Sequence, residues 1–199
     1  MKVLGFAGSP RRNSNTDILL AEVLKGAAST GAETKTVVIP NMNIMACQNC
    51  DACLRTGSCP FGDNMQEIYR DLAWADRVVL TAPLHFMGLP SQTKAMVDRM
   101  QALWVKKYVL KQPPLGDMHE RLGLFVTVGG RSGEHLFEPA LATVKAFFAS
   151  LDIKYAGMLA YSGIDKRAEI LNHPEALKEA FAAGERLASA EPLPHEELK

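Results

Sequence analysis

Residues 8–16 read Gly8-Ser9-Pro10-Arg11-Arg12-Asn13-Ser14-Asn15-Thr16 and join a short apolar run at 3–7 to a run with helical periodicity that begins at Asp17. The first backbone N–H groups of a helix have no acceptor inside the helix, and the helix dipole adds positive potential at that end. This loop adds two guanidinium groups, several hydroxyls and side-chain amides. It matches neither G-x-G-x-x-G nor G-x-x-x-x-G-K-[ST]. The junction predicts an anion site suited to a terminal phosphate; a polar surface turn before a capped helix is the alternative interpretation.

The composition is that of an ordinary globular protein. The chain has 199 residues, 47% of them hydrophobic and 22% charged, which suits one domain with a sizeable core. The formal net charge is zero, so we expect neither nucleic acid nor an anionic membrane as a partner, because both favour basic patches. The N-terminus lacks a signal-peptide pattern, and no apolar run approaches the ~20 residues that span a bilayer. We therefore expect a cytoplasmic protein.

Apolar periodicity divides the chain into alternating strands and helices. Apolar or β-branched runs predict five strands, at residues 2–7, 34–39, 77–81, 122–128 and 153–161. Helical spacing predicts a helix capped by Asn15 or Thr16 and ending near Ser29, one capped by Asp63 or Asn64, one that contains Met96, Met100 and Leu103, one over residues 137–148, and one that begins at Pro174. Residues 104–120 are less regular, and we expect them to form a lid or a contact with a second subunit.

Five alternations of strand and helix predict a parallel sheet with helices on both faces and right-handed crossovers. The length fits a three-layer α/β fold of the flavodoxin-like type, with a five-stranded parallel sheet in the order 2-1-3-4-5. We expect one domain over residues 1–190, with a Cys-rich insertion at 41–62. A C-terminal tail at 191–199, rich in Pro and Glu, is expected to be frayed.

In this fold the ligand lies where the strand order reverses, so the loops after the first, third and fourth strands should converge on one crevice. The loop after the third strand contains His85 and Phe86, and the loop after the fourth contains Gly129 and Gly130. We expect a flat, phosphorylated ligand, with its phosphate on residues 8–16 and its ring between the other two loops.

The four cysteines, Cys47, Cys50, Cys53 and Cys59, lie close together in the sequence. In a reducing compartment such crowding points to a metal or a cluster rather than to disulfides. Thiolates at this spacing can turn back onto one iron–sulfur core, and Pro60 follows the last cysteine as in bacterial ferredoxin runs. Zinc also takes four thiolates, although structural zinc sites more often separate two C-x-x-C pairs by a longer span. A [4Fe–4S] cluster, a zinc ion and free thiols without a metal all stay open.

Several motifs together resemble one protein family. They are the loop at 8–16, the array Cys47-x-x-Cys50-x-x-Cys53 with Cys59, and the segments Asp63-Asn64-Met65-Gln66-Glu67-Ile68, Pro83-Leu84-His85-Phe86 and Lys94-Ala95-Met96-Val97-Asp98-Arg99. With these motifs the sequence resembles the NAD(P)H-dependent, FMN-binding oxidoreductases of flavodoxin-like fold, and within them the iron–sulfur flavoproteins. The resemblance covers about residues 2–165.

The resemblance implies FMN as the ligand of the crevice. The residues expected at its phosphate are Ser9, Arg11, Arg12, Ser14, Asn15 and Thr16. Those expected around its isoalloxazine ring are Pro83, Leu84, His85, Phe86, Met87 and Gly88, with Gly129 and Gly130 supplying backbone near the ring. The sequence departs from the family pattern at His85, where tyrosine is usual, and at Met87-Gly88, where a Gly-Ser pair is common.

The resemblance also implies an oxidoreductase with NAD(P)H as co-substrate. It would pass electrons between NAD(P)H or a ferredoxin-like donor and an acceptor, using FMN and a [4Fe–4S] cluster, as a homodimer or homotetramer. A flavin or quinone reductase without a cluster and a flavodoxin-like electron carrier are the alternatives. No side chain is required as a general acid or base, because the flavin carries the chemistry. His85 is a candidate proton relay, or else a packed or solvent-facing histidine.

Overall fold

The computed structural model describes residues 1–189, and the predicted tail at 191–199 lies outside them. Five parallel strands form one sheet in the order β2-β1-β3-β4-β5, as predicted. They are β1 (Lys2–Ala7), β2 (Glu33–Val38), β3 (Arg77–Pro83), β4 (Arg121–Gly129) and β5 (Ile153–Ser162). Every predicted strand is therefore present, within two residues of its expected bounds.

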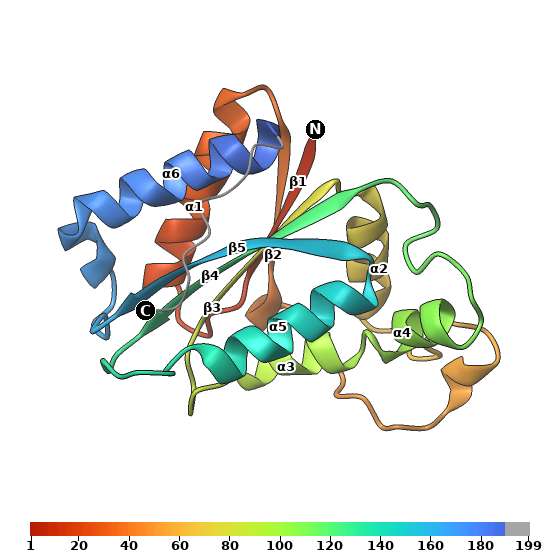
Figure 1. Ribbon diagram of the computed structural model, residues 1–199. Helices are drawn as coiled ribbons and strands as arrows, with labels where there is room; N and C mark the ends of the chain where they lie inside the picture. Colours follow the sequence, from red (N-terminus) through yellow and green to blue (C-terminus); the bar gives the residue numbers. More distant parts are fainter. Residues whose placement is uncertain (190–199) are drawn as a thin grey trace.

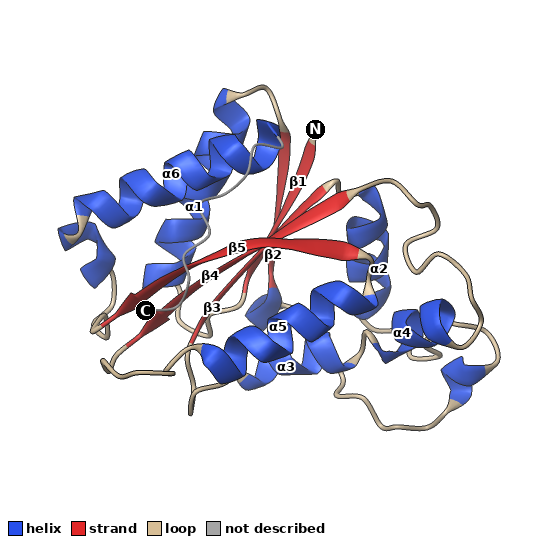
Figure 2. Ribbon diagram, in the orientation of Figure 1, coloured by secondary structure: helices blue, strands red, loops and turns tan. Residues whose placement is uncertain are grey.

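Helices cover both faces of this sheet (Figure 1). The helices α1 (Asn15–Ser29) and α6 (Pro174–Ser189) lie on one face, and α2 (Met65–Trp74), α3 (Ser91–Asp98) and α5 (Glu138–Ser150) lie on the other, as Figure 2 also shows. Successive strand residues point to opposite faces. Accordingly Leu4 and Phe6 belong to one buried apolar cluster, and Val3 and Ala7 belong to the other. Because both faces are covered, the inner strands β1, β3 and β4 are largely buried and mostly apolar, whereas most of the edge strand β2 is exposed.

The helices α1 and α6 touch through their backbones. A Cβ atom at Gly26 would lie 1.9 Å from the carbonyl oxygen of Phe181, and one at Gly184 would lie 1.9 Å from that of Val23. No side chain fits at either position without moving a helix. This contact fixes α1, whose N-terminus begins at the predicted anion loop.

The first helix begins differently from the prediction. Its N-cap is Ser14, not Asn15 or Thr16: the Ser14 hydroxyl accepts from the N–H of Asp17 at 3.2 Å, and the Asp17 carboxylate accepts from the N–H of Ser14 at 3.0 Å. This reciprocal pair is a capping box, which satisfies both N–H groups locally. Asn15 and Thr16 thereby become the first two helical residues.

The predicted single helix through Met96, Met100 and Leu103 is wrong. The structure divides it into α3 and α4 (Gln101–Tyr108), so residues 104–108 are helical rather than irregular. The Tyr69 hydroxyl donates to the carbonyl oxygen of Arg99 at 2.6 Å, and the N–H of Leu103 donates to Met100 at 2.9 Å instead. The interruption therefore coincides with a contact from α2. Met96 and Met100 are buried, as their helical spacing predicts.

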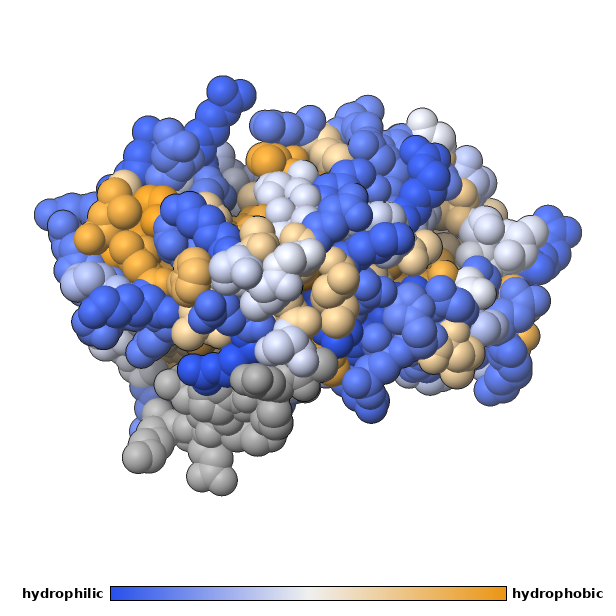
Figure 3. All heavy atoms as spheres, turned by 90° about the horizontal axis from the view of Figure 1, so that it is seen from above, coloured by the Kyte–Doolittle hydropathy of each residue, from blue (hydrophilic) through white to orange (hydrophobic). Residues whose placement is uncertain are grey.

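Short 3₁₀ segments complete the described fold: η1 (Ile39–Asn41), η2 (Ala52–Leu54) and η3 (Glu169–Asn172). None of the helices within residues 1–189 is long and apolar enough to cross a membrane. Figure 3 shows hydrophilic residues over most of the face seen from above, with apolar residues gathered toward the side where α6 begins.

Candidate functional site

A cavity of about 180 Å³ lies at the carboxyl ends of β1, β3 and β4, where the strand order reverses. Its walls come from the loop at 8–16, the start of the loop after β3, the end of β4 with the following loop, and the segment after β5. The lining residues are Ser9, Pro10, Arg11, Ser14, Asn15, Thr16, Pro83, Leu84, His85, Val128, Gly130, Ile164, Asp165 and Arg167. The three loops expected to converge do so, and a fourth segment joins them.

The N-terminus of α1 supplies hydrogen-bond donors to this cavity. Within residues 1–189 the backbone N–H groups of Asn15 and Thr16 have no acceptor. The hydroxyls of Ser14 and Thr16 lie 3.1 Å apart, and all three residues line the cavity. Free N–H groups, hydroxyls and the positive end of the helix dipole form a donor set that suits a phosphate.

Gly8 holds the start of the loop against its neighbours. Its N–H donates to the carbonyl oxygen of Thr81 at 2.7 Å, and its carbonyl oxygen accepts from the Thr93 hydroxyl at 2.9 Å. A Cβ atom at Gly8 would lie 2.6 Å from that hydroxyl and 2.7 Å from the Thr81 oxygen. The loop therefore leaves β1 at a position that only glycine allows without a shift.

The predicted phosphate residues do not all face the same space. Arg11 lines the cavity and donates to the carbonyl oxygen of Asp165 at 3.1 Å, which holds its guanidinium across one wall. Arg12 does not line the cavity; it lines a second groove of about 570 Å³ between α1 and β2, which Arg11 also borders. The Asn15 amide bonds to the Lys166 carbonyl at 2.9 Å and to the Ile170 N–H at 3.1 Å. Asn15 thus joins α1 to the segment after β5, and its backbone N–H stays free for a ligand.

The loop after β3 ends in a tight turn beside the cavity. His85 and Gly88 exchange backbone hydrogen bonds of 3.0 Å, and the two residues between them, Phe86 and Met87, have φ angles of 51° and 64°. Left-handed backbone at both central positions is the conformation of a type I′ turn, which favours Asn and Gly. Phe86 is fully exposed at the tip. Pro83, Leu84 and His85 line the cavity, whereas Phe86, Met87 and Gly88 do not.

His85 is exposed and its ring makes no hydrogen bond to any described residue. This placement agrees with the solvent-facing interpretation of that histidine, although His85 still borders the cavity.

The segment after β5 forms the wall that the sequence analysis missed. The N–H of Ile164 donates to the carbonyl oxygen of Gly129 at 3.0 Å, which ties this segment to the end of β4. A Cβ atom at Gly130 would lie 3.0 Å from the Asp165 carboxylate, so the lack of a side chain there allows the approach. The Glu169 carboxylate accepts from the N–H groups of Lys166 and Asp165, and these bonds lower its pKa. The predicted topology contained a signal for this wall. Because β5 is parallel to the other strands, the loop that follows it begins at the same edge of the sheet as the other three loops.

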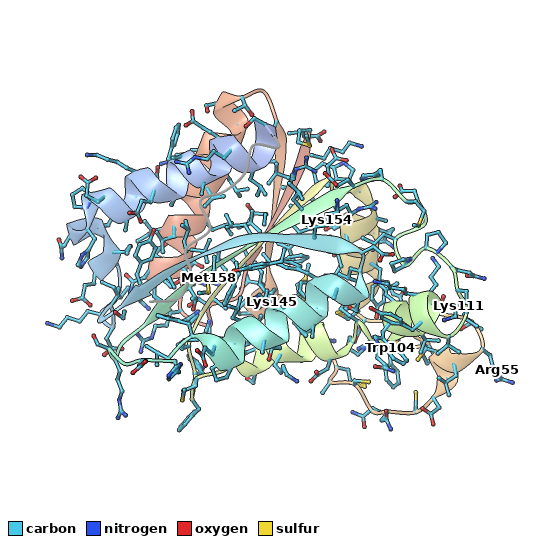
Figure 4. The ribbon with its side chains drawn as sticks, in the orientation of Figure 1. Arg55, Trp104, Lys111, Lys145, Lys154 and Met158 are labelled. Carbon is cyan, nitrogen blue, oxygen red and sulfur yellow. The ribbon has the colours of Figure 1, made fainter. Side chains whose placement is uncertain are left out.

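The cysteines lie on a loop whose two ends are fastened together. The N–H of Asn43 donates to the Asn64 side chain at 2.7 Å, and the N–H of Asn64 donates back to the Asn43 carbonyl at 3.2 Å. The N–H of Met45 donates to the Asp63 carboxylate at 2.9 Å. Figure 1 shows this loop passing beside α4, and Figure 4 shows Arg55 of the loop at the same end of the molecule as Trp104 of α4.

All four cysteines are free thiols that line one hollow, together with Pro60, Phe61 and Arg99. Burial raises the pKa of the Cys53 thiol, and the neighbouring thiols Cys59, Cys47 and Cys50 raise it further. Within residues 1–189, however, no group of three or more Cys, His, Asp or Glu side chains is arranged to hold a metal ion. The four thiols that line this hollow form a donor set whose chemistry fits a thiolate-bound metal group.

The sequence is similar to those of two iron–sulfur flavoproteins from archaea. The chain is 35% identical over 130 residues to an iron–sulfur flavoprotein of Methanosarcina thermophila, a match that covers 65% of this chain and 64% of that one. It is 33% identical over 150 residues to an iron–sulfur flavoprotein of Methanocaldococcus jannaschii, covering 74% of this chain and 71% of that one. The chain thus spans less than two thirds of the first of these relatives.

Among solved structures, an NAD(P)H:quinone oxidoreductase from Methanothermobacter marburgensis superposes with a TM-score of 0.74 at 19% identity, over 94% of this chain and 96% of that one. A flavodoxin from the domain Archaea superposes with a TM-score of 0.57 at 11% identity, over 96% of this chain and 98% of that one. At these identities the likeness concerns the fold, which is flavodoxin-like. The model of the family described as NADPH-dependent FMN reductase matches residues 1–159, and the chain belongs to that family.

Proposed function

We propose that this protein binds FMN in the cavity at the sheet edge and acts as an FMN-dependent oxidoreductase that takes electrons from NAD(P)H. One observation carries the proposal: a helix N-terminus with free N–H groups and the Arg11 guanidinium line the same cavity as the apolar ends of β3 and β4. Family membership supports FMN as the ligand of this cavity.

The residues present fit the two ends of FMN. At the phosphate end, the N–H groups of Asn15 and Thr16 supply hydrogen-bond donors, and Arg11 supplies positive charge for the phosphate dianion. At the ring end, Leu84, Val128 and Ile164 supply apolar walls. Apolar walls exclude water and hold a flat ring in place.

The chemistry that FMN supplies when bound is acceptance of a hydride from nicotinamide and release of electrons in pairs or singly. The chain's own task is to position the cofactor and to control access. Pro83, Leu84, Gly130 and Ile164 all line the cavity. No side chain there is required to hold or move a proton for hydride transfer.

Titration of the apoprotein with FMN, followed by quenching of flavin fluorescence, tests the binding. We expect saturable binding of one FMN per chain, and at least tenfold weaker binding of riboflavin, which lacks the phosphate. Equal affinity for the two flavins, or no binding, would contradict the assignment of the first loop. Bleaching of the bound flavin by anaerobic NADH or NADPH supports the reductase; bleaching only by a reduced ferredoxin supports the alternative of an electron carrier.

We propose further that Cys47, Cys50, Cys53 and Cys59 hold a [4Fe–4S] cluster, which supplies one-electron transfer to or from a carrier. Their close spacing and their common hollow support this assignment. The names of the curated relatives, which are iron–sulfur flavoproteins, support it as well.

Iron and acid-labile sulfide assays on anaerobically purified protein test the cluster. About four iron atoms per chain are expected for a [4Fe–4S] cluster, and Cys53→Ser should abolish them. One zinc per chain would favour a zinc site. A flavin-loaded protein with neither metal, even after anaerobic reconstitution, would leave a flavin or quinone reductase.

We propose a homodimer or homotetramer as the assembly. Four large apolar side chains are each between 41% and 48% exposed and lie on adjoining segments: Leu54 on η2, Trp104 and Tyr108 on α4, and Val109 directly after α4. Large apolar side chains that gather on a surface are typical of an interface. Sedimentation velocity is expected to give a dimer or tetramer for the wild type and a smaller species for Trp104→Glu.

A further inference from the structure

A buried ion pair lies directly under the cysteine loop. Arg99, at the break between α3 and α4, is 1% exposed, and its Nη1 and Nη2 atoms bond the two carboxylate oxygens of Asp63 at 2.6 and 3.1 Å. Nη1 also donates to the carbonyl oxygen of Met45 at 2.7 Å. Arg99 therefore contacts both ends of the loop that carries the four thiols.

One nitrogen of this guanidinium has no acceptor. Among the described residues, Arg99 Nε is a buried side-chain atom without a hydrogen-bond partner. Each of the two terminal nitrogens has a partner in Asp63 or Met45, so among the described residues Nε is the nitrogen of this group that has none. A buried, charged N–H without an acceptor is costly, and such a group calls for a specific explanation.

The residue that carries this unpaired donor lines the thiol hollow. Arg99 lines that hollow with the four cysteines, and the Phe61 ring lies 5.2 Å from its Cζ atom. The Gln66 amide donates to the carbonyl oxygens of Cys59 and Phe61 at 3.1 and 3.0 Å. These bonds fix the part of the loop that lines the hollow together with Arg99. Burial opposes the charged form of Arg99, yet the bonds to Asp63 and the nearness of Cys59 raise its pKa, so the charge persists.

We propose that Arg99 donates its Nε–H to a sulfur atom of the group that Cys47, Cys50, Cys53 and Cys59 hold, and so tunes the reduction potential of that group. The inference rests on the proposed cluster. Hydrogen bonds and positive charge near the sulfur atoms favour the reduced form, because reduction adds negative charge there. The Asp63 carboxylate bonds both terminal nitrogens and so fixes the Arg99 side chain where it lines the hollow.

Two variants separate the donor from the charge. Arg99→Lys keeps a cation opposite Asp63 and lacks the Nε–H. Asp63→Asn keeps the Nε–H and removes the charge that offsets Arg99. The measurement is a redox titration of the iron-loaded holoprotein, followed by EPR, with the rate of iron loss to a chelator as a second readout.

We expect Arg99→Lys to lower the reduction potential of the cluster. At a fixed solution potential the ratio of oxidised to reduced cluster should rise about tenfold, which corresponds to a shift of ~59 mV for one electron. The same variant should lose iron faster. Asp63→Asn should shift the potential in the opposite direction. If Arg99→Lys fails to fold by circular dichroism, the double variant Arg99→Gln with Asp63→Asn leaves no unpaired charge, and it should show the same lowered potential.

A wild-type protein that assembles the cluster, with an unchanged potential and unchanged iron loss in Arg99→Lys or in the double variant, would overturn the inference and leave the proposed function standing. A wild-type protein that binds no iron after reconstitution would overturn the cluster itself, and the inference would fall with it.

Discussion

Gly8→Ala is the most direct perturbation of the anion loop. The new Cβ atom would lie 2.7 Å from the Thr81 carbonyl oxygen, where ordinary contact begins at 3.4 Å, so the backbone must separate by about 0.7 Å. It would also lie 2.6 Å from the Thr93 hydroxyl, which is bonded to the Gly8 carbonyl. The φ angle of Gly8 lies outside the left-handed region, so the effect of the methyl group is steric.

The cost follows from two terms. Overpacking a tight site costs about 1–3 kcal/mol, and weakening the bond from Gly8 to Thr81 costs about 1 kcal/mol more. The sum, about 2–4 kcal/mol, corresponds to a fall in Tm of roughly 6–12 °C for a protein of this size. Because residues 9–16 follow Gly8 directly, we also expect at least a tenfold loss of FMN affinity, or about 1.4 kcal/mol.

Thermal unfolding and fluorescence titration with FMN and riboflavin check this prediction. The loss of affinity should be larger for FMN than for riboflavin, since the loop faces the phosphate. Gly133→Ala is the matched control, because a Cβ atom there meets nothing within 4 Å, and it should leave both quantities unchanged. A Gly8→Ala protein with the wild-type Tm and FMN affinity would refute the reasoning.

Three further predictions concern the capping box, the helix contact and the buried ion pair. Ser14→Ala removes the N-cap of α1 and should lower stability by about 1 kcal/mol, measured by urea unfolding, whereas Ser14→Thr should keep most of it. Gly184→Ala should destabilise by about 2 kcal/mol, because the backbone clash with Val23 outweighs the ~1 kcal/mol that alanine gains in a helix; a stabilised variant would contradict this. Asp63→Asn should cost about 3–5 kcal/mol in the metal-free protein at pH 7, because it leaves Arg99 buried and unpaired. Burial raises the pKa of Asp63, but the bonds from Arg99, Met45 and Met65 hold it below its usual value, so the wild type should lose this stability only as pH falls below about 4, seen in unfolding curves from pH 7 to pH 3.

The strand order and the position of the cavity could be predicted from the sequence. Apolar runs of strand length, separated by helix-periodic segments, leave few arrangements for a parallel sheet, and the ligand edge follows from the strand order. The loop at 8–16 was informative because its chemistry is local: hydroxyls and arginines at a helix start act wherever the helix lies. The same holds for the cysteine spacing, which restricts the kind of group that the thiols can share.

Other features depend on contacts between distant segments. The Tyr69 hydroxyl of α2 donates to the carbonyl oxygen of Arg99, and no local sequence pattern around Met100 predicts that the helix is interrupted there. Arg99 is buried and is paired with Asp63, thirty-six residues away in the sequence, and no local pattern gives that pairing. Arg11 and Arg12 are adjacent and alike in the sequence, but only Arg11 lines the cavity, whereas both border the groove between α1 and β2. The sequence by itself determined the layers, the ligand edge and the donor chemistry, since these follow from periodicity and residue type. Only the tertiary structure decided which side chains face the cavity, because that depends on contacts between segments that are far apart in the sequence.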